Sequence, residues 1–341
     1  MPVLQRFITA MLAASSITLA LGLAYALHLE RPYWAGIAAM VLSQSAQGQS
    51  LEKGIWRMVG TVAGALAGMA MLAAFGESLG ALLLASAVIL ASIVVLMHGS
   101  RYSYFYYSTA LMLVLVTAQS HSEPPFRIAV ARMQENLVGI AAYTLCALCL
   151  RPRTASRELD SLPRFGRGVF RELADHFDPV ILRGKLMTGA SALMALSMLA
   201  VLWQVFDPPG TESPVFVEIG AIFILLGVMV GSFPAWTLLA AFAVGIPLSI
   251  WLYASVLPQL SGYGQLGAVM FTAAFLMAWL LPAPEQGMAR MGVLMPVFVL
   301  SGLGGEVFPP GGVMSGAAGL LCSALAVSLI FNIMRRPDGN F

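Results

Sequence analysis

Four charged residues interrupt stretches of the chain that are otherwise apolar, and they are the first candidates for chemistry. A charge in such a setting is costly and usually functional. We therefore assign Arg57 and Arg132 to a pathway for anionic solutes. Because burial favours the neutral form of a carboxyl group, we assign Glu135 and Glu218 to proton exchange. Taken singly, each is better explained as a snorkelling arginine or an interfacial glutamate, but we favour a functional role for at least one of them.

Arg132 and Glu135 form the most informative pair. They are three residues apart, so on a helix they share a face and can pair. Only about 15 apolar residues follow Glu135 before Arg151, which is too few to cross a hydrocarbon layer of about 30 Å at about 1.5 Å per residue. The sequence therefore predicts that the pair lies at, or just inside, the outer boundary of a membrane.

A polar stretch ends the second apolar segment, in RPYWAGIAAMVLSQSAQGQS from Arg31. Ser43, Gln44 and Gln47 continue a helix where a lipid-facing surface would still need apolar groups, so they should face protein or a water-filled path. With Trp34 they are candidates for lining a solute pathway. An aromatic belt at the membrane interface is the other interpretation of Trp34.

Small residues recur on the third apolar segment. Gly60, Gly64 and Gly68 are spaced by four, a pattern that lets two helix backbones approach closely, and we assign them to helix packing. Thr61 lies beside them and could serve either packing or the pathway.

Composition identifies the elements that must position these residues. Of 341 residues, 59% are hydrophobic and only 10% are charged, against roughly 25% charged in soluble domains. The net charge is only +2, and the basic residues are spread among loops rather than gathered on one face, which argues against a nucleic-acid partner. The three cysteines lie in apolar runs and are expected to pack. No metal, cofactor or enzyme motif is indicated, and there is no phosphate-binding loop for ATP hydrolysis.

The predicted fold is all-α, a polytopic membrane protein with about 12 transmembrane helices. Apolar stretches fall at about 7–27, 33–47, 56–75, 79–98, 102–118 and 130–150, and again at about 186–206, 215–230, 234–256, 263–281, 290–303 and 312–334. We expect a first six-span module (1–150), a short cytoplasmic linker that is partly an amphipathic helix (151–185), and a second six-span module (186–341).

The two modules are predicted to be repeats. LMLVLVTAQSHSEPP from Leu111 is similar to LMPVFVLSGLGGEVFPP from Leu294, and both halves close on Arg-Pro. If the N-terminus is cytoplasmic, all but three of the 18 lysines and arginines, namely Arg31, Arg127 and Arg132, fall on the cytoplasmic side. This bias predicts an inner-membrane protein with both termini in the cytoplasm.

Several of these motifs resemble the fusaric acid resistance and aromatic acid exporter family of bacterial inner-membrane proteins. The resemblance is carried by RPYWAGIAAMVLSQ, IWRMVGTVAGALAG, ARMQENLVGI and LRPR in the first half, and by YASVLPQLSGYGQLGAVMF and PAPEQG in the second. It implies export of small aromatic or other weak organic acids, with a periplasmic adaptor (membrane-fusion) protein and an outer-membrane channel. Because there is no phosphate-binding loop, we expect the proton gradient to drive this export. The short linker departs from longer relatives that carry a large cytoplasmic region.

Two other functions stay open at this point. One is a passive organic-anion channel, because the aluminium-activated malate channels of plants look distantly similar. The other is a non-transporting scaffold of an envelope complex. Besides the solute, the expected partners are membrane lipid and, in an assembly that the sequence leaves open, further copies of the chain.

Overall fold

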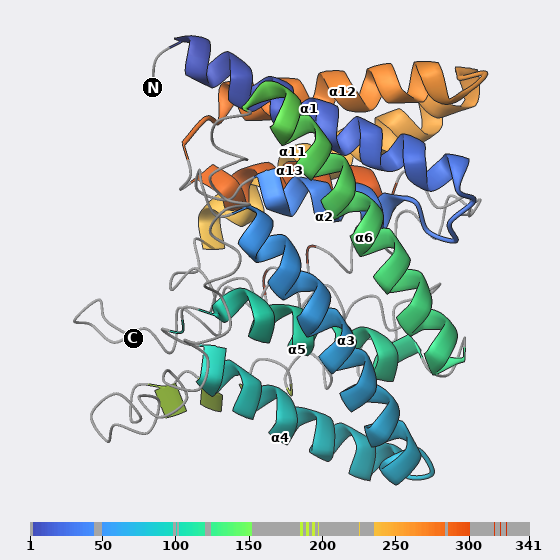
Figure 1. Cartoon of the computed structure of the whole chain (residues 1–341), viewed down its shortest axis with the longest axis vertical. Helices are drawn as coiled ribbons and strands as arrows, with labels where there is room; N and C mark the ends of the chain where they lie inside the picture. Colours follow the sequence, from blue (N-terminus) through green and yellow to red (C-terminus); the bar gives the residue numbers. More distant parts are fainter. Residues whose placement is uncertain are drawn as a thin grey trace. The chain divides into compact units, whose positions relative to one another are not determined.

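The computed structural model describes residues 3–43, 50–97, 100, 102–119, 124–151, 235–283 and 286–300, with some isolated positions between 185 and 325 (Figure 1). Within these ranges the chain is helical and contains no strand. The helices are α1 (Val3–Ala26), α2 (Tyr33–Ser43), α3 (Ser50–Phe75), α4 (Leu79–Met97), α5 (Ser103–Gln119), α6 (Pro125–Leu150), α11 (Ala235–Trp251), α12 (Tyr263–Leu280) and α13 (Gly287–Leu300). The prediction of an all-α fold is confirmed.

The apolar stretches predicted in the first half correspond to α1 through α6, and three stretches of the second half correspond to α11, α12 and α13. The stretches predicted at 186–206, 215–230 and 312–334, and the linker at 151–185, lie largely outside the described residues. The total of 12 spans and the two-repeat arrangement therefore stay predictions.

Membrane-spanning character is visible in the helix lengths. In the described part of the chain, six helices are long and apolar enough to cross a membrane, as the segments Val3–Ala26, Glu52–Phe75, Gly80–Met97, Pro125–Leu150, Trp236–Gln259 and Tyr263–Leu280. The chain is thus a multi-pass membrane protein. α11 reaches its full length because it continues through a π-helical turn, Leu252–Val256, and a 3-10 turn, Leu257–Gln259.

α2 and α13 are almost wholly buried. Over the 11 residues described for α2 and the 14 described for α13, both helices are apolar and nearly every residue is enclosed by the protein. They are core helices within the described part of the chain.

The chain forms two compact units that do not follow its two halves. Unit 1 contains residues 1–55, 131–162 and 237–317, and unit 2 contains 56–130, 163–236 and 318–341. Unit 1 therefore combines α1, α2 and most of α6 with α11, α12 and α13. Unit 2 holds most of α3 together with α4 and α5.

In unit 1, α1 packs along α12 in antiparallel fashion (Figure 1). Near the start of α1, the Phe7 ring meets the edge of Trp279, with centroids 6.4 Å apart. Ala13 and Ala278 share a buried apolar cluster. Further along α1, the Thr18 carbonyl accepts a hydrogen bond from the hydroxyl of Tyr263, at the start of α12.

α6 follows α2 in a parallel direction within unit 1. A Cβ added at Gly139 of α6 would lie 2.5 Å from the Ala35 carbonyl oxygen of α2, closer than any real side chain permits. Further along both helices, Leu42 packs with Tyr143 and Cys146 in a buried cluster. Only glycine at position 139 allows the two helices this approach, which fixes the first part of α6 against the start of α2.

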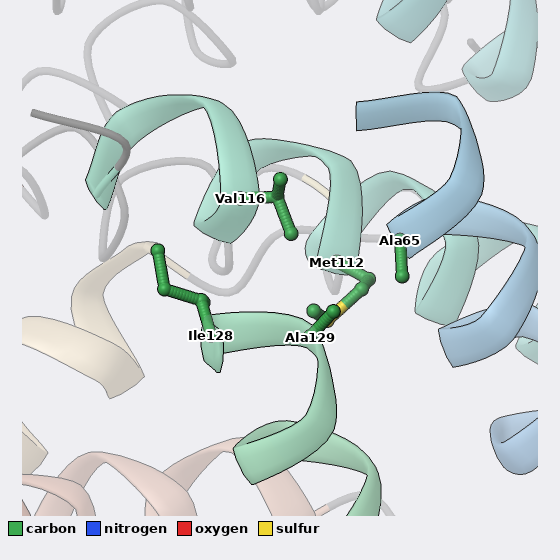
Figure 2. Close-up of a cluster of buried hydrophobic side chains, with 5 residues drawn as sticks. All are labelled: Ala65, Met112, Val116, Ile128 and Ala129. Carbon is green, nitrogen blue, oxygen red and sulfur yellow. The ribbon is translucent and has the colours of Figure 1, made fainter. Parts of the chain in front are cut away.

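In unit 2, the glycine series of α3 lies against α5. A Cβ at Gly60 would lie 2.5 Å from the Phe105 carbonyl oxygen, and one at Gly64 would overlap the carbonyl oxygen of Thr109. One turn further, Gly68 faces the side chain of Val116. Beside this seam, α3, α5 and the first turn of α6 contribute the buried cluster of Figure 2, made of Ala65, Met112, Val116, Ile128 and Ala129.

α11 and α13 repeat this glycine packing within unit 1. Gly245 of α11 lies against the backbone carbonyls of Gly292 and Val293 in α13. The Ser249 hydroxyl, one turn further on, donates a 2.9 Å hydrogen bond to the Pro296 carbonyl. α13 is thereby fixed to α11 along its length.

Candidate functional site

The most polar site of unit 1 is a buried ion pair on α6. The Arg132 guanidinium donates a hydrogen bond to the Glu135 carboxylate, and the exposed fractions of the two side chains are only 4% and 1%. Their spacing of three residues puts them on one face of the helix, as the sequence predicts. The pair is therefore buried rather than solvent-exposed.

Glu135 also has a second donor. The backbone N–H of Arg31, in the turn before α2, donates to the other carboxylate oxygen of Glu135 at 3.1 Å. Each carboxylate oxygen therefore accepts from a different element, the side chain of Arg132 on α6 and the backbone preceding α2. Such bonds offset part of the large cost of removing a carboxylate from water.

Trp34 completes this cluster from the first turn of α2. The central carbon of the Arg132 guanidinium lies 4.7 Å from the Trp34 ring centroid, which is a cation–π contact. Trp34 is only 8% exposed, so its ring is enclosed by protein, and its assignment to the solute pathway or to an interfacial belt stays a prediction. Its position next to Arg132 follows from the Gly139 approach, which brings α6 against the start of α2.

Two N–H donors in the cluster are unused. In the described part of the chain, neither Nε1 of Trp34 nor Nε of Arg132 has a hydrogen-bond acceptor, and both atoms are buried. Buried donors are normally paired, because leaving one unpaired costs about 1–3 kcal/mol. The cluster can therefore donate two further hydrogen bonds to an acceptor. A second carboxylate is a suitable acceptor, because Arg132 already binds the carboxylate of Glu135.

A second polar cluster lies in unit 2, around Arg57. The side chain of Arg57 is buried near the start of α3, and its Nη1 donates to the Tyr104 hydroxyl of α5 at 3.1 Å. The ring of Tyr107 stands next to that of Tyr104, with centroids 5.8 Å apart. Arg57 is thus buried and hydrogen-bonded to a phenol group of α5.

Sequence reasoning missed these tyrosines. Tyr104 and Tyr107 share a face of α5 at a spacing of three, within the run YSYFYY, and that spacing was the available signal. Thr61, in contrast, uses its hydroxyl within its own helix, where it donates to the Arg57 carbonyl at 2.7 Å. The choice between packing and the pathway for Thr61 stays open.

The other candidate residues are placed as follows. Ser43 is the last residue of α2 that the structure describes. It is partly buried, and its hydroxyl donates to the Met40 carbonyl at 2.7 Å. Gln44, Gln47 and Glu218 lie outside the described residues. The structure thus brings together Trp34, Arg132 and Glu135 in unit 1, and Arg57 and Thr61 in unit 2. Among the residues that the structure describes, no three His, Cys, Asp or Glu side chains gather as metal ligands would.

The described helices and their buried ionic groups define a multi-pass membrane protein, and buried ionic groups inside apolar helices are common in membrane transport proteins. Residues 6–164 match the model of the fusaric acid resistance protein family, which confirms the predicted resemblance for that part of the chain. The match includes Trp34, Arg57, Arg132 and Glu135, and it indicates a role in membrane transport or resistance. The comparisons with curated proteins and with solved structures give no significant match.

Proposed function

We propose that this protein is an inner-membrane efflux transporter of small organic acids, aromatic acids among them, whose movement is coupled to protons through Glu135. The observation that carries the proposal is the position of Arg132, held inside unit 1 between the Glu135 carboxylate and the Trp34 ring. The family match over residues 6–164 supports transport as the general activity.

The chemistry of the cluster favours an aromatic carboxylate as solute. Arg132 already binds a carboxylate, so the carboxylate of a solute could take the place of Glu135. The indole of Trp34 offers an apolar surface for an aromatic ring, and its free Nε1 offers a further donor to the same carboxylate. A neutral solute of the same shape would leave Arg132 with Glu135 and would gain none of these bonds.

Competition for one arginine also links the solute to the proton. While Glu135 is ionised it occupies Arg132, but a proton on Glu135 removes its charge and releases the guanidinium. A solute that displaces Glu135 leaves a buried carboxylate without its partner, which then favours binding a proton. Solute binding and proton binding are therefore expected to assist each other, so that solute and proton cross the membrane together. Inward proton flow would then oppose export, and efflux would be driven by an excess of the solute in the cytoplasm.

The predicted topology is also part of the proposal. In unit 1, Nε of Arg6 on α1 donates to the Trp279 carbonyl at the end of α12 at 2.6 Å. The Arg151 side chain, just after α6, donates to the Thr9 hydroxyl of α1. The start of α1 and the ends of α6 and α12 therefore meet, which supports a common cytoplasmic face. A periplasmic adaptor protein and an outer-membrane channel would receive the solute on the other side.

Counterflow of radiolabelled benzoate in proteoliposomes tests this function, because benzoate is the simplest aromatic carboxylate. We expect the wild-type protein to exchange benzoate, Arg132→Gln to lose at least about 90% of the exchange, and Arg127→Gln to retain it. A loss of this size corresponds to about 1.4 kcal/mol or more, the range of a hydrogen bond to a charged group. Arg127 is the matched control, because it lies on α6 and is exposed.

Two results would reject the proposal. One is normal exchange by Arg132→Gln at normal abundance in the membrane. The other is a wild-type protein that passes unitary electrical currents with benzoate but shows no counterflow, which would identify a channel.

A further inference from the structure

Arg290 on α13 is a buried charge that the proposed function does not yet use. Its side chain is only 6% exposed, and its Nε has no hydrogen-bond acceptor among the residues that the structure describes. The sequence counts Arg290 among the cytoplasmic loop charges, but the structure places it inside a core helix. A guanidinium cannot lose its proton in a protein, so burial leaves it charged.

The surroundings of Arg290 on α13 are apolar or glycine. Two residues further along, Gly292 packs against Leu238 and Ala241 of α11. The neighbours Met288 and Met291 are buried as well. A charged group without a partner in such a place is strongly unfavourable, and a bound anion is the simplest group that offsets it.

The position of Arg290 within α13 adds further donors. α13 begins at Gly287, so Arg290 is its fourth residue. Side chains on a helix tilt toward the N-terminus, which directs Arg290 over the first turn. The first four N–H groups of a helix have no partner within it, and the helix dipole favours an anion there. The guanidinium and the first turn of α13 therefore favour an anion at the same place.

The direction of α13 relative to α2 determines at which end of α2 the first turn of α13 lies. α2 runs antiparallel to α1, because Leu12 of α1 packs near Leu42 whereas Leu21 lies against Gly36. α12 is also antiparallel to α1, so α2 and α12 run in the same direction. Because α13 begins only a few residues after α12 ends, we take α13 to return in the opposite direction.

This register puts Arg290 at the far end of α2 from Trp34. Phe298 of α13 lies against Gly36, near the start of α2. Arg290 is eight residues before Phe298, about 12 Å back along α13, and Ser43 is seven residues after Gly36, about 10 Å along α2. Arg290 is thus level with Ser43, where the polar end of the second apolar segment begins.

The geometry points to Arg290 and the first turn of α13 as a second carboxylate site in unit 1, which receives the solute from the cytoplasmic side before it reaches Arg132. This inference rests on the proposed function. The two arginines stand at opposite ends of α2, roughly 14 Å apart along its axis. The predicted topology puts the Arg290 end toward the cytoplasm and the Trp34 end toward the periplasm.

Sided transport measurements test this assignment. Benzoate counterflow is measured with the full chain in inside-out and right-side-out membrane vesicles, and the half-saturating concentration is determined at each face. For Arg290→Gln we expect a rise of about tenfold or more at the cytoplasmic face and a change of less than about twofold at the periplasmic face. Arg290→Lys keeps a point charge, so its half-saturating concentration should lie between those of the wild type and Arg290→Gln.

A stability measurement separates binding from packing. Methionine has a long apolar side chain, so Arg290→Met should fold, with a melting temperature equal to or above that of the wild type, because it removes a buried charge. Benzoate should raise the melting temperature of Arg132→Gln through the remaining site, but should leave that of the double variant Arg132→Gln with Arg290→Met unchanged.

Two outcomes would overturn the inference while leaving the proposed function intact. In the first, the wild-type protein exchanges benzoate, but the half-saturating concentration of Arg290→Gln is either unchanged at both faces or raised equally at both. The other is equal benzoate protection of Arg132→Gln and the double variant. If the wild-type protein exchanges no benzoate at all, the proposed function itself fails, and the second site fails with it.

Discussion

Removing Arg132 and removing Glu135 should change the free energy of unfolding differently as the pH falls. Glu135→Leu leaves a buried guanidinium that cannot lose its proton, and the loss of one partner of a buried pair costs about 3–5 kcal/mol. Arg132→Met leaves a carboxyl group, which can become neutral by binding a proton. At pH 7, neutralising an ordinary glutamate costs about 3–4 kcal/mol, so both variants should be destabilised by similar amounts there.

The two variants should then diverge as the pH falls. Near pH 5, neutralising the carboxyl group costs only about 1 kcal/mol. Arg132→Met should therefore recover about 2–3 kcal/mol relative to the wild type. The reason is that its folded state binds a proton more readily than its unfolded state, so a lower pH favours folding. Glu135→Leu should recover nothing. The double variant Arg132→Met with Glu135→Leu should lie within about 1 kcal/mol of the wild type or above it.

Reversible unfolding in mixed detergent micelles at about pH 7 and pH 5 measures these free energies. The order of the variants is the decisive result. If Glu135→Leu also recovers at low pH, or if both single variants stay within about 1 kcal/mol of the wild type, the pair is not a buried ionic interaction and the argument fails.

Two further predictions concern unit 2. Gly64→Ala should destabilise the protein by about 1–3 kcal/mol, because the added methyl group overlaps the Thr109 carbonyl oxygen, whereas Gly80→Ala, with open space around it, should be neutral or slightly stabilising. Equal stability of the two glycine variants in the unfolding assay would show that α3 and α5 are not in close contact. Tyr104→Phe removes the acceptor of the Arg57 hydrogen bond and should cost about 1.5–3 kcal/mol, and a cost below about 0.5 kcal/mol would show that this bond contributes little.

Apolar length predicts most of the described helices, because a segment in lipid must satisfy its own backbone hydrogen bonds. The six stretches of the first half appear as α1 to α6 within a few residues. α6 begins at Pro125 rather than near residue 130, because proline suits the first position of a helix even though PFR is not an apolar run. The i, i+3 spacing likewise predicts the pairing of Arg132 with Glu135.

Contacts between distant segments are not visible in the sequence. Nothing local to Trp34 indicates that Arg132, on a helix about 100 residues later, stacks on its ring. Arg290 looks like a loop charge because it stands at the edge of an apolar run, and only the packing of α13 shows that it is buried. The tyrosines around Arg57 were missed for the same reason.

The central claim is that one buried arginine is shared between Glu135 and the solute, and the proton carried with benzoate tests it most directly. Wild-type proteoliposomes with a trapped pH indicator should show proton movement together with benzoate movement. Glu135→Gln should move benzoate without protons, because its amide mimics a permanently protonated carboxyl group. Benzoate movement in the wild type without any accompanying proton, or an unchanged proton signal in Glu135→Gln, would contradict the account.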